Sequence, residues 1–286
     1  MLNSLLSRFA AETEIHVSLK GEQVAEFAGI AITNSMVYGL VVAVFMAIVL
    51  TSIAKKSTVK PAKKNYIVAT LESVIQFVVG MLEGAFGSRA KAYKYAPVFG
   101  TFFIFILFTN IMGLFPLVGS ALEVETAEGA IPLFRPFTAD LNGTIVMSVI
   151  AILYVQYLSI KAQGVKGHLT HYFSDKPFNP INFFIGILEV FGEFTRILSL
   201  SLRLFLNTAV GEILIAVFTS LVLTGGRTPI AVIPIFLFEF LVAGIQAYVF
   251  TILTATYLSL AISHADHSDE HEEVNALKVE ELVPSS

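Results

Sequence analysis

Apolar runs separated by short charged segments dominate the pattern of this chain. Six such runs cover residues 27–54, 65–88, 95–122, 141–160, 178–223 and 230–263. A helix needs about 20 mainly apolar residues to cross the hydrocarbon core of a bilayer. The pattern therefore predicts an all-α integral membrane protein with about five to six membrane helices.

The charged residues between the runs predict a topology. Five lysines follow the first run, at positions 55, 56, 60, 63 and 64. Because basic loops stay on the cytoplasmic side, the N-terminus is expected outside. Residues 65–88 contain Glu72 and Glu83, which we expect at the interface, and are followed by Arg89, Lys91 and Lys94. Basic clusters at both ends predict a segment on the cytoplasmic side, either lying in the membrane plane or re-entering as a hairpin.

Three parts of the chain differ in composition. Residues 1–29 lack the compact pattern of a secretory signal and are expected to be an extracytoplasmic segment. Residues 30–263 form one membrane domain. Residues 264–286 are acidic and polar, and are predicted to be a disordered cytoplasmic tail.

The last two apolar segments are too long for upright membrane helices. A helix over residues 180–223 would be ~65 Å long at ~1.5 Å per residue. The hydrocarbon core is only ~30 Å thick. We therefore expect a long, steeply tilted C-terminal helical hairpin that packs beside a partner.

Arg203 lies inside the first of these two long segments. A permanent cation is costly to hold in a bilayer, and Arg does not lose its proton there, so its position indicates function. Successive helical residues rotate by ~100°, so a spacing of seven places Glu189, Arg196 and Arg203 on one face. Asn207 joins that face, whereas Glu212 falls on the opposite one.

The last segment carries Glu239 and Gln246, seven residues apart and so on one helical face. Glu212 and Glu239 are both positioned to line an outward-facing polar cavity and could share a proton. A second polar face lies toward the cytoplasmic end. Two aqueous pockets separated by the fixed charge of Arg203 are the parts of a proton path with a barrier in it.

Structural interpretations of the same residues compete with this one. Arg203 could pair with Glu189 or Glu193, and Arg196 could form a helix pair with Glu193, three residues earlier. Asp140 could cap the helix that begins near residue 141. Other polar residues fit helix packing or a solvated tail rather than ligand binding: Ser199, Ser201, Thr208, His264, His267 and His271.

Composition excludes several other classes of protein. The 286 residues are 55% hydrophobic and 14% charged, against roughly 25% charged in soluble domains. The chain has no Cys, which rules out disulfides and thiolate metal sites. No GxxxxGK[ST] loop is present, so we expect no bound nucleotide. We also expect no cofactor, no metal and no nucleic acid.

The motifs around Arg203 resemble those of subunit a of the F-type ATP synthases. That family has a Ser-Leu-Arg-Leu-Phe-x-Asn stretch followed by an acidic residue, and here residues 201–207 read SLRLFLN, followed by Glu212. Further matches, in the same order as in the family, are FTNIMGLFP at 108–116, TADLNGT at 138–144, IQAYVF at 245–250 and LTATYL at 253–258. The resemblance runs from about residue 33 to 263.

This resemblance implies a role for each of the candidate residues. Arg203 would be the essential charge that faces the carboxylates of the rotating c-ring, and Asn207 would shape that contact. The outer half-channel would be lined by Glu212, Glu239 and Gln246, with Asp140 near its mouth. The cytoplasmic half-channel would have Glu189 and Glu193 beside it.

The resemblance also implies partners and a location. The chain would contact the c-ring, subunit b of the peripheral stalk and the lipid bilayer of the inner cell membrane. It would couple proton flow to ATP synthesis on other subunits and would have no catalytic site of its own. Two positions depart from the family pattern: Leu206 replaces a frequent Gly, and Glu239 stands where some members carry His.

Other functions remain open from the sequence. A secondary transporter or ion channel would also use intramembrane charges, but would predict internal repeats and broken helices. A structural scaffold would tolerate neutralisation of Glu212 and Glu239. A sodium-coupled form of the ATP synthase subunit is a further alternative.

Overall fold

Six long helices and two short β-hairpins make up the part of the chain that the computed structural model describes. It describes residues 21–27, 30–57, 66–114, 123–126, 129–132, 135–173, 180–224 and 233–282. The helices are α2 (Asn34–Ser57), α3 (Tyr66–Phe86), α4 (Arg89–Gly113), α5 (Leu141–Phe173), α6 (Pro180–Thr224) and α7 (Ile233–Leu282). Within this part of the chain, all six are long and apolar enough to cross a membrane. The prediction of an all-α integral membrane protein is confirmed.

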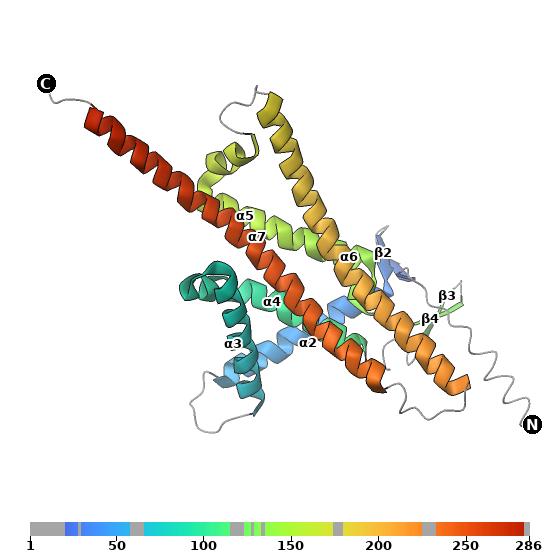
Figure 1. Cartoon of the computed structure of the whole chain (residues 1–286). Coiled ribbons are helices and arrows are strands. Elements are labelled where there is room, and N and C mark those ends of the chain that lie inside the picture. The colour runs from blue at the N-terminus through green and yellow to red at the C-terminus, as the bar shows by residue number, and fades with distance from the viewer. Residues whose placement is uncertain are drawn as a thin grey trace, which may run out of the picture.

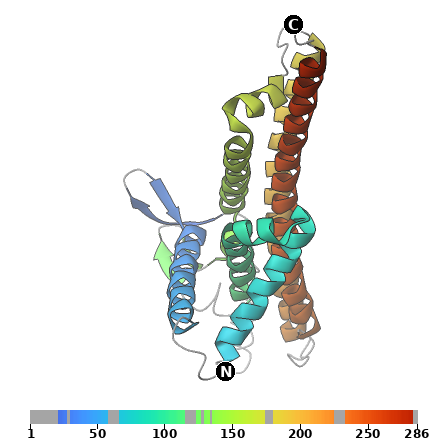
Figure 2. The ribbon, with the colours of Figure 1, turned by 90° about the vertical axis from the view of Figure 1, so that its left-hand side faces the viewer.

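The helices form a layered bundle in which the last two helices cross the others obliquely. Figure 2 shows α2 on one side, α6 and α7 together on the other, and α4 and α5 between them. The α6–α7 hairpin runs obliquely across α4 and α5, whereas α3 lies near the start of α4 and contacts α4 and α7 (Figure 1). At ~1.5 Å per residue, the 45 residues of α6 and the 50 of α7 span ~68 and ~75 Å.

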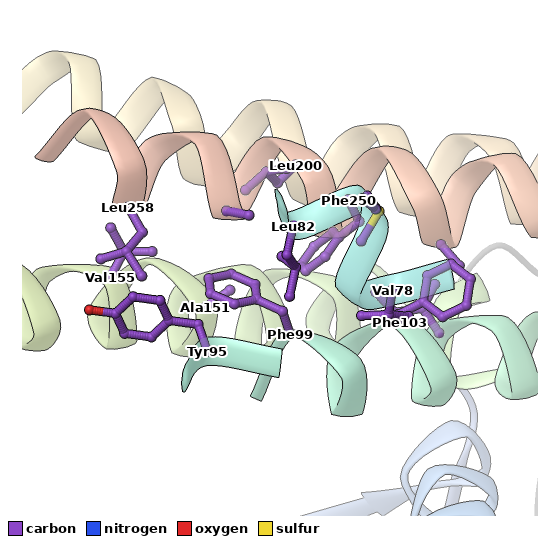
Figure 3. Close-up of a cluster of buried hydrophobic side chains, with 14 of the residues drawn as sticks. Val78, Leu82, Tyr95, Phe99, Phe103, Ala151, Val155, Leu200, Phe250 and Leu258 are labelled. Carbon is purple, nitrogen blue, oxygen red and sulfur yellow. The ribbon is translucent and has the colours of Figure 1, made fainter. Parts of the chain in front are cut away.

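The core lies where α3, α4, α5, α6 and α7 meet (Figure 3). Lipid tails are as apolar as Leu, so close van der Waals packing rather than escape from water holds such helices together. Four alanines with no exposed surface allow the backbones to approach: Ala92, Ala151, Ala247 and Ala255. The large side chains that fill the remaining space are Leu82, Phe99, Ile106, Leu200, Leu204, Phe250 and Leu258.

The N-terminal region differs from the expectation that the first membrane run begins at residue 27. Strands β1 (Gln23–Phe27) and β2 (Ile30–Thr33) form an antiparallel hairpin, and the helix starts only at Asn34. Thr33 Oγ1 accepts a hydrogen bond from the Met36 backbone N–H at 3.4 Å, as an N-cap residue does. An apolar run alone does not distinguish a short strand from the first turns of a helix.

A second hairpin lies in the acidic loop that follows α4. Strands β3 (Glu123–Thr126) and β4 (Gly129–Pro132) pair antiparallel, and the short 3-10 helix η1 (Phe137–Ala139) leads into α5. Figure 1 shows both hairpins at the same end of the bundle, away from α3.

Helix α3 is one continuous helix with no internal hairpin, so the re-entrant form expected for residues 65–88 is wrong. Gly87 ends it with a φ of 63°, a left-handed conformation that favours Gly, and its N–H bonds to the Glu83 carbonyl at 2.9 Å. The exposed Glu83 carboxylate lies 3.7 Å from Arg89, at the start of α4. The position of α3 relative to the bilayer stays a prediction.

Two helices extend beyond the apolar runs that predicted them. Helix α5 continues past residue 160 to Phe173, with a kink at Gly164. Helix α7 continues through residues 264–282, so the prediction of a disordered tail is wrong there. This stretch contains no Gly or Pro and several good helix formers, and the next Pro is Pro284, just beyond the helix.

Candidate functional site

Arg203 lies half-buried on α6 and forms no ion pair within the described part of the chain. Its Nη2 donates a hydrogen bond to Ser199 Oγ, one turn earlier, at 3.4 Å. The carboxylate of Glu193, an expected alternative partner, is bound to Arg196 instead. Glu189 lies 14 residues before Arg203, ~21 Å along the helix. The structural ion-pair interpretation of Arg203 therefore finds no support.

Asn207 and Gln246 connect the two long helices. Asn207 Nδ2 on α6 donates to Gln246 Oε1 on α7 at 2.6 Å. The Gln246 side chain is only 2% exposed. This contact lies one turn beyond Arg203, so the cation and an inter-helix amide pair are adjacent on α6.

Glu239 packs directly against the backbone of α6 beside Glu212. The Glu239 side chain is 7% exposed, and a Cβ placed on Gly211 would collide with its carboxylate. Only the missing side chain of Gly211 allows this approach. Glu239 thus lies against the residue that precedes Glu212 on α6, and the expectation that the two carboxylates share one cavity stays a prediction.

Gly211→Ala is therefore expected to displace the Glu239 carboxylate and to impair its candidate role in the polar cavity. Gly244→Ala on α7 is the matched control, because nothing lies within 4 Å of a Cβ at that position. If the chain has the role that its sequence resemblance implies, ATP-driven proton pumping in inverted membrane vesicles should fall about fivefold or more with Gly211→Ala, the size of effect that misplacement of a working group produces. Equal pumping by both variants, at equal amounts of assembled protein, would contradict the assignment.

Arg135 and Tyr38 add charge and polarity to the neighbourhood of Glu212. Both lie within electrostatic range of the Glu212 carboxylate. Arg135 is buried and donates from Nη2 to the Ala139 carbonyl at 3.3 Å. Sequence reasoning missed both residues: Tyr38 lies in an ordinary apolar run, and Arg135 is a single basic residue in a loop. The apolar neighbours of Arg135 were the one available sign that it is buried.

Asp140 is a helix cap, as one of the two sequence interpretations proposed. Its Oδ1 accepts the Asn142 backbone N–H at 3.0 Å, at the start of α5. Its Oδ2 accepts a hydrogen bond from Ser35 Oγ on α2 at 2.5 Å. The carboxylate is 4% exposed, so it also ties the N-terminus of α2 to that of α5.

Asp140 belongs to a group of buried polar side chains between α2, α4, η1 and α5. Within this group, Thr138 Oγ1 donates to Asn110 Oδ1 at 2.7 Å, and the Tyr38 hydroxyl donates to the Thr109 carbonyl at 3.3 Å. Its buried members are Asn34, Ser35, Thr109, Asn110, Arg135, Thr138, Asp140, Thr144 and Ser148. Contacts between α6 and η1 connect this group to the helix that carries Glu212.

Arg196 confirms the helix-pair interpretation. Its Nη1 forms an ion pair with Glu193, three residues earlier on α6. Its guanidinium also lies over the ring of Tyr257 on α7, 4.9 Å from the centroid. Glu189 is half-buried one turn before Glu193.

No group of three or more His, Asp or Glu side chains suited to a metal ion occurs among the described residues. The side chains of His264, His267 and His271 lie outside that part of the structure, so the expectation that they bind no metal is untested.

Comparison with known proteins identifies what the chain is similar to. The family model of the ATP synthase A chain matches residues 36–259. The chain is 32% identical over 277 residues to ATP synthase subunit a 2 of Chlorobaculum tepidum, covering 93% of this chain and 73% of that protein. It is 30% identical over 238 residues to ATP synthase subunit a of Aquifex aeolicus, covering 82% and 99%. The chain is also 31% identical to ATP synthase subunit a of an Anaeromyxobacter species, and it spans 53% of the length of that protein.

Proposed function

Because the chain belongs to the ATP synthase A chain family and is a multi-pass membrane protein, we propose that it is the proton-translocating stator subunit of an F-type ATP synthase. In this role it forms two half-channels that load and unload the carboxylates of a c-ring. Proton flow then turns the ring, and the rotation drives ATP synthesis on other subunits.

The observation that carries this proposal is the setting of Arg203. It is a cation without an ion pair in the described structure, on a helix whose neighbouring side chains are large, apolar and exposed. Those flanking side chains are Leu198, Leu202, Leu206 and Val210. A surface of this kind suits contact with a lipid-embedded rotor, and a cation at its centre favours the ionised form of a passing carboxylate.

The outer half-channel would follow the buried polar residues. Protons would enter past Asp140 and reach Glu212 and Glu239; the Glu239 carboxylate lies against Gly211, the residue before Glu212. The Asn207–Gln246 pair would form the inner end of this route, one turn from Arg203. The support is the contact between η1 and α6 and the position of the buried Arg135 within electrostatic range of Glu212.

The cytoplasmic half-channel would open along the opposite part of α6. Glu189 would line it, and Glu193 would act there through its ion pair with Arg196. In the orientation that the basic clusters predict, the N-terminus lies outside and the C-terminus in the cytoplasm of a cell with this protein in its inner membrane. Subunit b of the peripheral stalk is a further proposed partner.

A cross-linking experiment tests the contact with the ring. The chain has no Cys, so one introduced Cys reports on one position. Leu206→Cys, with a 51% exposed side chain, is expected to form a disulfide with a Cys placed beside the ring carboxylate. Leu40→Cys on α2, 67% exposed, is the matched control and should not react. Equal reaction at both positions, or none at Leu206→Cys in the assembled complex, would contradict the proposal.

A further inference from the structure

Two polar contacts join α6 to α7, one on each side of Arg203. The Asn207–Gln246 hydrogen bond lies toward the end of α6, and the contact of Arg196 with Tyr257 lies toward its start. The two contacts are 11 residues apart on each helix, which is about three helical turns or ~16 Å. They therefore lie along one line of contact between the antiparallel helices, and Arg203 lies between them.

The two cations of α6 differ in how their charge is compensated. Arg196 and Arg203 are the only basic residues of α6 and are two turns, ~10 Å, apart on nearly the same face. The guanidinium of Arg196 is bound to Glu193 and lies over the ring of Tyr257. Among the described residues, Arg203 has a hydrogen bond to Ser199 and no ion pair.

We propose that Glu193 is a positioning residue: it neutralises Arg196 and holds it against Tyr257, so that Arg203 is the only uncompensated cation that α6 presents to the rotor. This inference rests on the proposed function. Glu193 itself then carries no protons, which differs from the role that the family resemblance implied for it.

The physical reason is the place of the second cation. In the proposed orientation, Arg196 lies on the cytoplasmic side of Arg203. During ATP-driven pumping, a ring carboxylate that leaves Arg203 takes up a proton from the cytoplasm. A free Arg196 cation two turns further along would keep that carboxylate ionised and oppose the uptake. In apolar surroundings this interaction is poorly screened.

Charge-pair variants test the inference in the assembled ATP synthase. We compare initial rates of ATP-driven proton pumping in inverted membrane vesicles for Glu193→Gln, Arg196→Gln, the double variant and Glu193→Asp. Glu193→Gln, which removes only the carboxylate, is expected to lower the pumping rate about fivefold or more, the size of one uncompensated charge interaction. Arg196→Gln and the double variant are expected to stay within about twofold of wild type, because neither leaves a free cation. Glu193→Asp keeps the charge and should retain most of the rate.

The pattern of the variants separates charge compensation from packing. A packing role predicts that Arg196→Gln is as harmful as Glu193→Gln and that the double variant is not rescued; that result would overturn the inference. The complex with Glu193→Gln could fail to assemble. In that case, assembly and pumping of the complex with the double variant support charge compensation, and failure of both complexes to assemble overturns it. Arg203→Ala serves as the reference: if it is inactive while Glu193→Gln pumps normally, only the inference fails, and if it pumps normally, the proposed function fails.

Discussion

Arg203→Ala is expected to abolish ATP-driven proton pumping in an ATP synthase that is otherwise fully assembled. A loss of about 100-fold or more is the scale for removal of one fixed electrostatic group at a working site. Arg203 forms no ion pair in the described structure, so its removal deprives no carboxylate among the described residues of a partner. The loss should therefore come from function and not from folding.

The measurement is the quench of a pH-sensitive dye in inverted membrane vesicles, normalised to the amount of assembled complex. Arg89→Ala is the matched control, because this Arg is 66% exposed at the elbow between α3 and α4. An exposed pair such as Arg89–Glu83 contributes little, so its rate should stay within about twofold of wild type. Pumping by Arg203→Ala at the rate of the control would mean that the buried charge is structural and would reopen the transporter and scaffold interpretations.

Arg203→Lys tests what kind of cation the site needs. Lys keeps the charge but loses the planar fork that binds a carboxylate in two places and the hydrogen bond to Ser199. If charge alone blocks direct proton flow, this variant leaks no more than wild type yet pumps more slowly. Rapid passive leak through Arg203→Ala but not through Arg203→Lys would assign the barrier to the charge.

Much of the fold follows from the periodic part of the sequence. The apolar runs predict the helices, and their unusual length predicts the long α6–α7 hairpin. The predicted helix boundaries are wrong where hydrophobicity does not decide the local structure. The β1–β2 hairpin lies within an apolar run, and residues 264–282 are helical although they are polar. Local backbone preference, and not hydrophobicity, decides these two segments.

The candidate site was predictable only within single helices. Helical spacing places Asn207 near Arg203 on one helix and puts Glu239 and Gln246 on one face of the next helix. It does not set the register between helices, so the contacts of Asn207 with Gln246 and of Glu239 with Gly211 become visible only in the fold.

The neighbourhood of Glu212 shows the same limit more strongly. Arg135 comes from the segment before η1 and Tyr38 from α2, both distant from Glu212 in the sequence. Neither belongs to a periodic polar face. Loop residues that are buried by tertiary packing carry no local signal, and only the apolar residues around Arg135 hint at its burial.

Glu212→Gln is the second change from which we expect a large loss. Gln has nearly the same shape and can hydrogen-bond, but it does not release or take up a proton. If Glu212 passes protons between the polar group at η1 and the ring, pumping should fall at least about tenfold, the scale of a lost proton-transfer group. Glu212→Asp keeps the carboxyl group and should retain part of the rate.

The neighbouring cation provides the decisive control. Glu212 lies within electrostatic range of Arg135, so Glu212→Gln also removes a negative charge near a buried Arg. Loss of an opposite charge near a buried cation is destabilising by itself. The double variant Glu212→Gln with Arg135→Gln removes both charges. It should remain inactive if Glu212 transfers protons, whereas recovery of pumping in the double variant would show that Glu212 serves only to balance Arg135.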